Sequence, residues 1–255
     1  SGKSLLAHAI MGILPENSKT KGSIKYYNDE LNEKYLRKVR GKDIAFIPQS
    51  VDFLDPLMKV GKQVVGINGN KERQKEVFKK YNLDDKVAEM YPFQLSGGMA
   101  RRVLIATAVM NEAKLIIADE PTPGLNLELA METLNNFREI ADSGCGVLLI
   151  THDVDLALNV ADRIAVFYSG TIVEIAQVED FIKGKDALRH PYSKAFIDAL
   201  PQNKFKELPG YQPYAGNLPK GCLFRDRCSL KTDECCMEIK MRKVRDGEVR
   251  CINAT

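Results

Sequence analysis

The feature that most constrains the fold is a series of short apolar runs that end in polar residues. The clearest one covers residues 115–118 and is followed directly by Asp119 and Glu120. Similar apolar runs occupy residues 44–47, 146–150 and 163–168. Amphipathic segments, such as 101–111 and 127–141, lie between them. Strands that alternate with helices predict an α/β fold, with a parallel sheet covered by helices on both faces.

Two stretches depart from this alternation. Residues 52–94 are charged and helical in pattern without a strand signal, so we interpret about 52–108 as an inserted helical subdomain. After residue 178 the alternation stops, and prolines punctuate a loop-rich tail. We therefore expect one α/β domain over residues 1–178, followed by a small, loop-rich C-terminal extension over residues 179–255.

Length and composition are those of an ordinary globular chain. The 255 residues suffice for one large domain with a small appendage. A net charge of +3 gives no argument for a nucleic-acid partner. No apolar stretch reaches the ~18 residues that crossing a bilayer requires.

The chain begins with Ser1-Gly2-Lys3-Ser4, followed by an apolar helical run. This pattern is typical of the second half of a P-loop, in which backbone N–H groups and a helix N-terminus face phosphate oxygens. Lys3 would reach the β- and γ-phosphates of ATP, and the Ser4 hydroxyl would bind Mg²⁺. Four residues alone are a weak signal. Since this is not a natural start, we expect that further residues precede Ser1 in the native protein.

Asp119 and Glu120 follow an apolar strand, at the edge where ligands of open α/β sheets bind. Asp119 is placed to hold Mg²⁺, usually through water. Glu120 is placed to act as the general base that polarises an attacking water. The alternative is that the two carboxylates only begin a loop.

A second glycine motif, Leu95-Ser96-Gly97-Gly98-Met99, precedes the helical run that starts at Ala100. It predicts another helix N-terminus suited to anions. One nucleotide does not need two such loops from one chain. The arrangement makes sense if this loop caps the γ-phosphate of a nucleotide that a different subunit holds.

With these motifs the sequence resembles the ABC ATPase family, whose signature motif is Leu-Ser-Gly-Gly-Gln. Met99 replaces the final Gln, as is frequent in peptide-importer members of that family. The motifs also follow the family's order: Lys3, Gln49 after a strand, residues 95–99, Asp119-Glu120, and His152 after the next strand. The resemblance covers residues 1 to about 178 and implies the P-loop NTPase fold.

The resemblance implies a role for each matching residue. Gln49 would contact Mg²⁺ and the nucleophilic water, and His152 would contact the γ-phosphate. Ser96, Gly97, Gly98 and Met99 would act on the ATP of the partner subunit. Two ATP molecules would thus lie between two ATPase subunits, and hydrolysis would release the closed pair. Asn126 stands where the family usually has an Asp in the loop between subunits, which puts the communication between the two sites in doubt.

The tail narrows the family. The segments 190–195, 200–201, 221–228 and 250–251 resemble the C-terminal region of ATPases from oligopeptide, dipeptide and nickel importers. The implied partners are two membrane permease subunits, a second, similar but non-identical ATPase subunit and, indirectly, an extracytoplasmic substrate-binding protein. The implied location is peripheral, at the cytoplasmic face of a prokaryotic cell membrane. The sequence does not separate peptide from nickel or metal-chelate cargo.

Five of the six cysteines crowd into the tail: Cys222, Cys228, Cys235, Cys236 and Cys251. Crowding of this kind suggests metal or cluster ligands rather than disulfides in a cytosolic enzyme. The spacing lacks the tight pairs that are usual for structural zinc, and four spread thiolates suit a [4Fe–4S] cluster. Related importer ATPases are similar in this tail and are thought to bind one. That resemblance selects Cys222, Cys228, Cys235 and Cys251; zinc-bound or free thiols are the alternatives.

Two other functions are compatible with parts of the sequence. ABC ATPases that act on DNA or ribosomes lack membrane partners, but they usually carry a second ATPase domain or a long coiled coil, and neither fits in this chain. A zinc ribbon that contacts nucleic acid would use the tail cysteines. The near-neutral charge of +3 argues against it.

Overall fold

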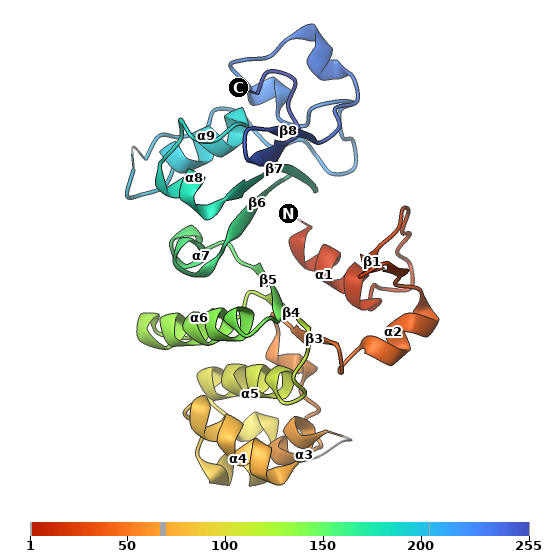
Figure 1. Ribbon diagram of the computed structural model, residues 1–255, viewed down its shortest axis with the longest axis vertical. Coiled ribbons are helices and arrows are strands. Elements are labelled where there is room, and N and C mark those ends of the chain that lie inside the picture. The colour runs from red at the N-terminus through yellow and green to blue at the C-terminus, as the bar shows by residue number, and fades with distance from the viewer. Residues whose placement is uncertain (1, 67–69, 204, 255) are drawn as a thin grey trace. The chain divides into compact units, whose positions relative to one another are not determined.

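The computed structural model describes residues 2–66, 70–203 and 205–254 and divides into two compact units (Figure 1). The core unit runs from Ser4 to Leu156. The C-terminal unit runs from Ala157 onward and also includes Gly2 and Lys3.

The core unit is built on a parallel sheet with the strand order β3-β4-β5. Its strands are β3 (Ile44–Ile47), β4 (Leu115–Asp119) and β5 (Gly146–Ile150). Ile44 pairs with Leu115, and Leu115 pairs with Gly146, so the three strands end at one edge of the sheet. Three of the four predicted strands are thereby confirmed as parallel neighbours.

Helix α1 (Lys3–Met11) packs on this sheet. Its Ala7 and Met11 belong to one buried cluster with Ile44, Ile117 and Ile150. The following segment contains a short hairpin and a helix: β1 (Lys25–Tyr26), β2 (Asp29–Glu30) and α2 (Glu33–Val39). Elsewhere in the unit, α6 (Leu127–Asp142) lies beside β5. Helix α7 (Val154–Val160) follows β5 along the chain; it begins in the core unit and ends in the C-terminal unit.

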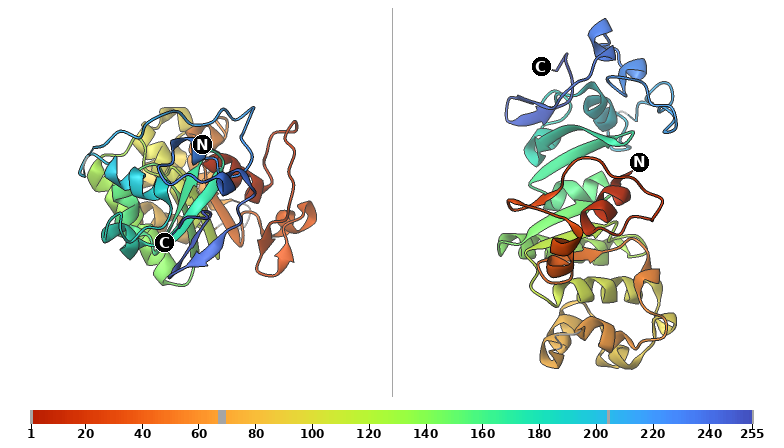
Figure 2. Two further views of the ribbon diagram at one scale, coloured as in Figure 1. Left: turned by 90° about the horizontal axis from the view of Figure 1, so that it is seen from above. Right: turned by 90° about the vertical axis from the view of Figure 1, so that its right-hand side faces the viewer.

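Between β3 and β4 the described residues form only helices and turns. The elements are η1 (Val51–Phe53), α3 (Val60–Val65), α4 (Lys71–Lys80), η2 (Asp85–Glu89), η3 (Pro92–Gln94) and α5 (Gly97–Val109). Helices α3, α4 and α5 gather at one end of the core unit in Figure 1 and in the right view of Figure 2. Close packing of α3 on η2 requires Gly61, because a Cβ there would lie 2.8 Å from Ala88. The part of the helical prediction that covers residues 67–69 lies outside the described residues.

The C-terminal unit contains an antiparallel sheet with the strand order β6-β7-β9-β8. Its strands are β6 (Arg163–Tyr168), β7 (Thr171–Gln177), β8 (Arg242–Val244) and β9 (Gly247–Val249). The prediction that residues 163–168 join the parallel sheet was therefore wrong. The physical reason is the turn Ser169-Gly170, where φ is +45° and +86°: two left-handed residues return the chain as an antiparallel hairpin.

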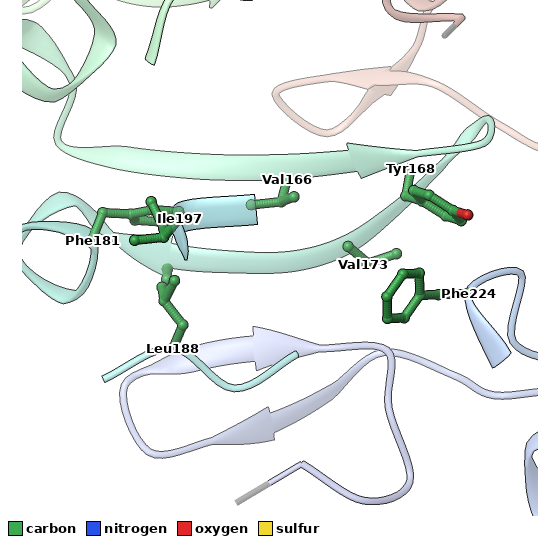
Figure 3. Packing of buried hydrophobic residues seen from close by; sticks show 8 residues of the cluster. Val166, Tyr168, Val173, Phe181, Leu188, Ile197 and Phe224 are labelled. Atoms are coloured by element: carbon green, nitrogen blue, oxygen red, sulfur yellow. The ribbon is translucent and has the colours of Figure 1, made fainter. Parts of the chain in front are cut away.

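Residues of the tail share a core with this hairpin. Leu188, Ile197 and Phe224 are buried together with side chains of β6 and β7. Figure 3 shows Phe224 beside Val173 and Tyr168. The helical elements of the tail are α8 (Val178–Ile182), α9 (Pro191–Asp198), η4 (Arg225–Arg227) and η5 (Asp233–Cys236). The extension is thus loop-rich, as expected, but its residues pack onto strands that precede position 178.

A buried carboxylate organises the start of α9. Glu174 on β7 is fully buried, and its two oxygens accept hydrogen bonds from the backbone N–H groups of Arg189 (2.8 Å) and His190 (2.9 Å). The Arg189 guanidinium contacts the same carboxylate at 3.4 Å and Asp180 at 2.8 Å. His190 Nδ1 accepts a hydrogen bond from the backbone N–H of Tyr192 and so caps α9. Burial lowers the pKa of His190 to about 4, so its imidazole is neutral at pH 7.

Candidate functional site

The two carboxylates at the end of β4 lie at the edge that the sequence predicts. Asp119 is 1% exposed, and its Oδ1 atom has no hydrogen-bond partner within the described parts of the chain. An unpartnered buried oxygen costs about 1–3 kcal/mol unless water or an ion satisfies it. This orphaned acceptor fits the role of holding hydrated Mg²⁺.

Glu120 lies directly after β4 and faces His152. Its Oε2 atom is 2.9 Å from His152 Nδ1, and its backbone N–H donates to the carbonyl of Ile150 at the end of β5. The Glu120 side chain is 9% exposed, whereas that of His152 is 74% exposed. The backbone of Glu120 has φ +48°, a left-handed conformation that a non-glycine residue adopts at a cost. The strained turn therefore presents a buried carboxylate to an exposed imidazole.

Gln49 follows β3, two positions beyond the last strand residue, and is exposed. The backbone before and at this position is held by Arg101 of α5. Arg101 donates hydrogen bonds to the carbonyls of Pro48 (2.8 Å) and Gln49. Burial lowers the pKa of the Arg101 guanidinium, and the negative charge of Asp119 opposes this shift. The guanidinium thus bridges the loop of Gln49 and the neighbourhood of Asp119.

The glycine motif begins α5. The Ser96 hydroxyl accepts a hydrogen bond from the Met99 N–H at 3.2 Å, which makes Ser96 the N-cap of the helix. A Cβ at Gly97 would meet no atom within 4 Å, so packing inside the chain does not require a glycine there. The first turn of α5 instead leaves backbone open to an approaching group, which suits an anion.

The P-loop residues fall on both units. Ser1 lies outside the described residues. Gly2 has φ +91°, which favours glycine, and Lys3 begins α1; both belong to the C-terminal unit. Ser4 follows in the first turn of α1 and belongs to the core unit.

Asn126 closes the loop after Glu120 and caps a helix. Its Oδ1 atom accepts a hydrogen bond from the Leu129 N–H at 2.9 Å, at the N-terminus of α6. Asp and Asn are similarly good in this position, so the replacement leaves the cap intact. What changes is the free side of the group, which in Asn is an NH₂ donor rather than a carboxylate oxygen.

The four tail cysteines selected by resemblance lie in one region. All are free thiols, and the Cys222 N–H donates to the Cys235 carbonyl at 2.9 Å. Burial raises the pKa of Cys222, Cys228 and Cys251, to about 11 for Cys251, and neighbouring thiols of the same set add to each increase. Among the residues that the structure describes, however, no three His, Cys, Asp or Glu side chains are arranged closely enough to hold a metal.

A hollow of about 520 Å³ in the core unit lies away from these residues. Its lining includes Lys114 and Cys145, which directly precede β4 and β5, and also Gly144. These positions mark the amino-terminal edge of the sheet, opposite the edge that carries Asp119 and Glu120. The hollow is therefore separate from the predicted nucleotide site.

Sequence reasoning missed two charged residues that organise the structure, Arg101 and Glu174. Both are nearly fully buried, at 6% and 0% exposure. Arg101 stands next to Arg102 in a helical run, and nothing in the pattern says which of two adjacent arginines faces inward. Glu174 interrupts the apolar strand Thr171–Gln177, and this was the available signal, because a charge in the middle of a buried strand requires partners.

Two protein families match different parts of the chain. The family described as ABC transporter matches residues 1–123. The family described as oligopeptide/dipeptide transporter, C-terminal region, matches residues 173–235.

Two curated relatives from Haemophilus influenzae are each 32% identical to the chain. One is the oligopeptide transport ATP-binding protein OppD, and the match covers 98% of this chain and 83% of the relative. The other is the dipeptide transport ATP-binding protein DppD, with 98% and 82% covered. The DppD protein of Escherichia coli K12 is 33% identical, with 92% and 78% covered.

Solved structures of ATP-binding cassettes are similar to the chain. One is a dimeric cassette in a post-hydrolysis state bound to ADP and Pi; it has a TM-score of 0.62 and 27% identity over 69% of this chain and 81% of that chain. Together with the carboxylate edge and the two glycine motifs, this likeness defines the class: the chain is an ABC-type cassette with the P-loop NTPase fold, an ATP hydrolase. Among the described residues, no helix is long and apolar enough to cross a membrane.

The relatives identify the family within this class. The chain belongs to the family of ATP-binding proteins of oligopeptide and dipeptide ABC transporters.

Proposed function

We propose that the chain is the ATP-hydrolysing subunit that powers an importer of dipeptides or oligopeptides, bound peripherally at the cytoplasmic face of a prokaryotic membrane. The observation that carries this proposal is the joining, in one chain, of the ABC cassette to the C-terminal region of oligopeptide and dipeptide transporters. Relatives that match over 98% of the chain are named for these two cargoes. Nickel or metal-chelate import is the runner-up within the same family.

The proposed chemistry assigns a role to each residue of the carboxylate edge. Glu120 takes the general-base role, because its carboxylate is buried and fixed by the strained turn, and because the imidazole of His152 is its one hydrogen-bond partner among the described side chains. His152 is exposed and so is free to contact the γ-phosphate of ATP. Asp119, Ser4 and Gln49 are proposed to hold Mg²⁺, which when bound would neutralise phosphate charge.

The remaining residues bind nucleotide. Ser1, Gly2, Lys3 and Ser4 would cradle the phosphates of the chain's own ATP. Ser96, Gly97, Gly98 and Met99 would complete the site of a second ATPase subunit, since the first turn of α5 leaves its backbone open. The proposed pair is the chain and a homologous, non-identical subunit, mounted on two membrane permeases that receive cargo from an extracytoplasmic binding protein.

Copurification tests this assembly. The full-length protein, isolated from membranes in a mild detergent, should bring with it two permease subunits and a second ATPase, and its ATP hydrolysis should rise when peptide-loaded binding protein is added. Recovery of ribosomes or DNA without a permease would favour an ABC ATPase that does not transport. Stimulation by a nickel-loaded binding protein, with none by peptide, would select the runner-up cargo.

For the tail we propose a structural [4Fe–4S] cluster held by Cys222, Cys228, Cys235 and Cys251. Its support is that Cys222, Cys228 and Cys251 each have a raised thiol pKa, to which neighbouring thiols of the same four contribute. Cys236 is exposed and is not among the contributing thiols. The thiols would have to move closer together to bind it, because the described residues form no ready metal site. The cluster would fasten loops that lack a core of their own.

Anaerobic purification followed by iron and sulfide analysis tests the cluster. About four irons and four sulfides per chain are expected, with a brown colour that the Cys228→Ser variant loses and the Cys236→Ser variant keeps. A colourless protein with one zinc per chain would establish zinc instead. Neither result affects the transport proposal.

A further inference from the structure

Two adjacent arginines of α5 make the same kind of contact with different parts of the core unit. Arg101 donates to the carbonyls of Pro48 and Gln49, which lie just beyond the end of β3. Arg102 donates to the carbonyls of Gly98, at 3.3 Å, and of Asn82, at 2.8 Å. Arg102 therefore fastens parts of the helical segment to one another, whereas Arg101 fastens that segment to the loop of Gln49.

The carbonyls that Arg101 contacts lack partners in the sheet. The pairing of β3 with β4 ends at Ile47 and Ala118, so the backbone at Pro48 and Gln49 has left the ladder. Pro48 is buried, and a buried carbonyl without a donor is costly. A planar guanidinium can donate to two neighbouring carbonyls at once, which an ammonium does less well. Arg101 thus fixes the backbone of a residue whose side chain remains exposed.

The cost of burying Arg101 indicates that this position requires a charged side chain. A guanidinium at 6% exposure gives up most of its hydration, and the two carbonyls and the nearby charge of Asp119 offset that loss. An apolar residue would fill the space without such a cost. The charge is therefore explained by the loop that it holds and not by packing alone.

We infer that Arg101 is a positioning residue that fixes the Gln49 loop to helix α5, so that Gln49 and the Ser96–Gly98 loop move together. The inference rests on the roles that are proposed above for Gln49 and for the Ser96–Gly98 loop. Through this link, a displacement of the helical segment by a membrane partner shifts Gln49 relative to Asp119. Equally, when the ATP of a partner subunit binds at the Ser96–Gly98 loop, the position of Gln49 changes.

A double-mutant cycle in the complete transporter tests the inference, with peptide-stimulated ATP hydrolysis as the readout. Arg101→Gln should lower kcat by about 10- to 100-fold, while the KM for ATP changes by less than about twofold, because the hydrogen bonds of Arg101 to described residues go to the loop of Gln49 and not to Gly2–Ser4. Gln49→Ala should lower kcat similarly, and the double variant should be no worse than Gln49→Ala. Arg102→Gln is the matched control, and its effect should multiply with that of Gln49→Ala. Arg101→Lys should restore less than half of the lost rate.

If the losses of kcat caused by Arg101→Gln and Gln49→Ala multiply in the double variant, the inference is overturned. An unchanged kcat in a folded Arg101→Gln protein would overturn it as well. An unchanged kcat in Gln49→Ala would overturn both the inference and the proposed role of Gln49. If the wild type shows no peptide stimulation, the proposed function fails, and a second measurement still decides the inference.

That measurement uses the absence of tryptophan from the chain. Phe53→Trp places one fluorophore near Gln49, at a side chain that is 55% exposed. With this reporter, Arg101→Gln should lower the steady-state anisotropy of the indole and Arg102→Gln should not. Equal anisotropy in both variants would overturn the inference.

Discussion

Two buried glutamates, one in each unit, differ in the hydrogen bonds that their carboxylates accept. Glu174 is saturated: its oxygens accept from two backbone N–H groups and from Arg189, and the neighbouring His190 is buried with its Nδ1 used as a helix cap. Among the side chains that the structure describes, His152 alone hydrogen-bonds to the Glu120 carboxylate, and that imidazole is 74% exposed. Burial of a carboxylate is thus common to both sites. What separates them is whether its lone pairs are already used.

The backbone shows the same contrast. Glu120 has φ +48°, whereas Glu174 lies in the regular strand β7. A strained backbone with an under-used carboxylate is typical of a site built for a reaction, because the surrounding structure sustains the strain. A relaxed backbone with a saturated carboxylate is typical of a structural joint. The comparison teaches that hydrogen-bond saturation, more than burial, distinguishes chemistry from architecture.

The largest expected effect comes from removing the unsaturated carboxylate. In the full-length protein, Glu120→Gln should lower steady-state ATP hydrolysis by about 10²–10⁴-fold, because the amide cannot take a proton from water. ATP binding and ATP-driven dimerisation should persist, since the residue makes no structural bond that an amide cannot replace. Phosphate release and size-exclusion chromatography with ATP measure the two properties. Glu132→Gln, on the exposed surface of α6, is the control. A Glu120→Gln rate within twofold of wild type would contradict the assignment.

The saturated carboxylate should give the reverse result. Glu174→Ala leaves Arg189 buried at 2% exposure without its carboxylate partner on β7 and leaves two N–H groups unpaired. We expect the free energy of unfolding of the C-terminal unit to fall by about 3–5 kcal/mol. Urea unfolding measures it, and Glu248→Gln, which removes a half-exposed contact with Arg163 at 3.7 Å, should cost less than about 1 kcal/mol. Equal losses of the free energy of unfolding in the two variants would contradict the structural role of Glu174.

The smallest effect concerns His190 and depends on pH. Its pKa of about 4 in the folded protein lies below the usual value of 6.5, because burial disfavours the charged imidazole. The unfolded chain therefore binds the proton more readily than the folded protein. The contribution of the neutral His190 to the free energy of unfolding is complete above pH 6.5 and is lost as pH falls toward 4. Over that window the contribution is up to about 3 kcal/mol.

The matched variant is His190→Asn, which keeps a side-chain acceptor for the cap of α9. Urea unfolding at pH values from 7 to 4 should show a shallower loss of stability than in wild type. A His190→Asn profile parallel to that of wild type would show that this histidine is not the one that titrates.

The sequence predicts where Asp119 and Glu120 lie because this edge of the sheet is set by neighbouring residues. Residues 115–120 contain the strand and both carboxylates, and parallel pairing then places His152 beside Glu120 through the end of β5. The same holds for Ser96, whose capping role depends on its own helix. Motifs of a few adjacent residues carry enough information to place such groups.

Prediction fails where distant segments decide the outcome. The parallel placement of residues 163–168 was wrong because the turn at Ser169-Gly170, and not the apolar pattern, sets the strand direction. The contacts of Arg101 join positions 52 and 53 residues apart, and no periodicity reports them. Glu174 likewise finds its partners 15 and 16 residues later, in a loop that reads only as a break in the pattern.

The strand order of the C-terminal unit has a consequence for synthesis on the ribosome. β7 pairs on one side with β6, which precedes it, and on the other with β9, and Val249 follows its partner Glu174 by 75 residues. At roughly 5–20 residues per second, this interval is about 4–15 s. Throughout it the β7 edge is open and able to pair with another nascent chain. Arg189 and His190, which emerge far earlier than β9, bind the Glu174 carboxylate on the same strand and are the first long-range contacts able to shelter it.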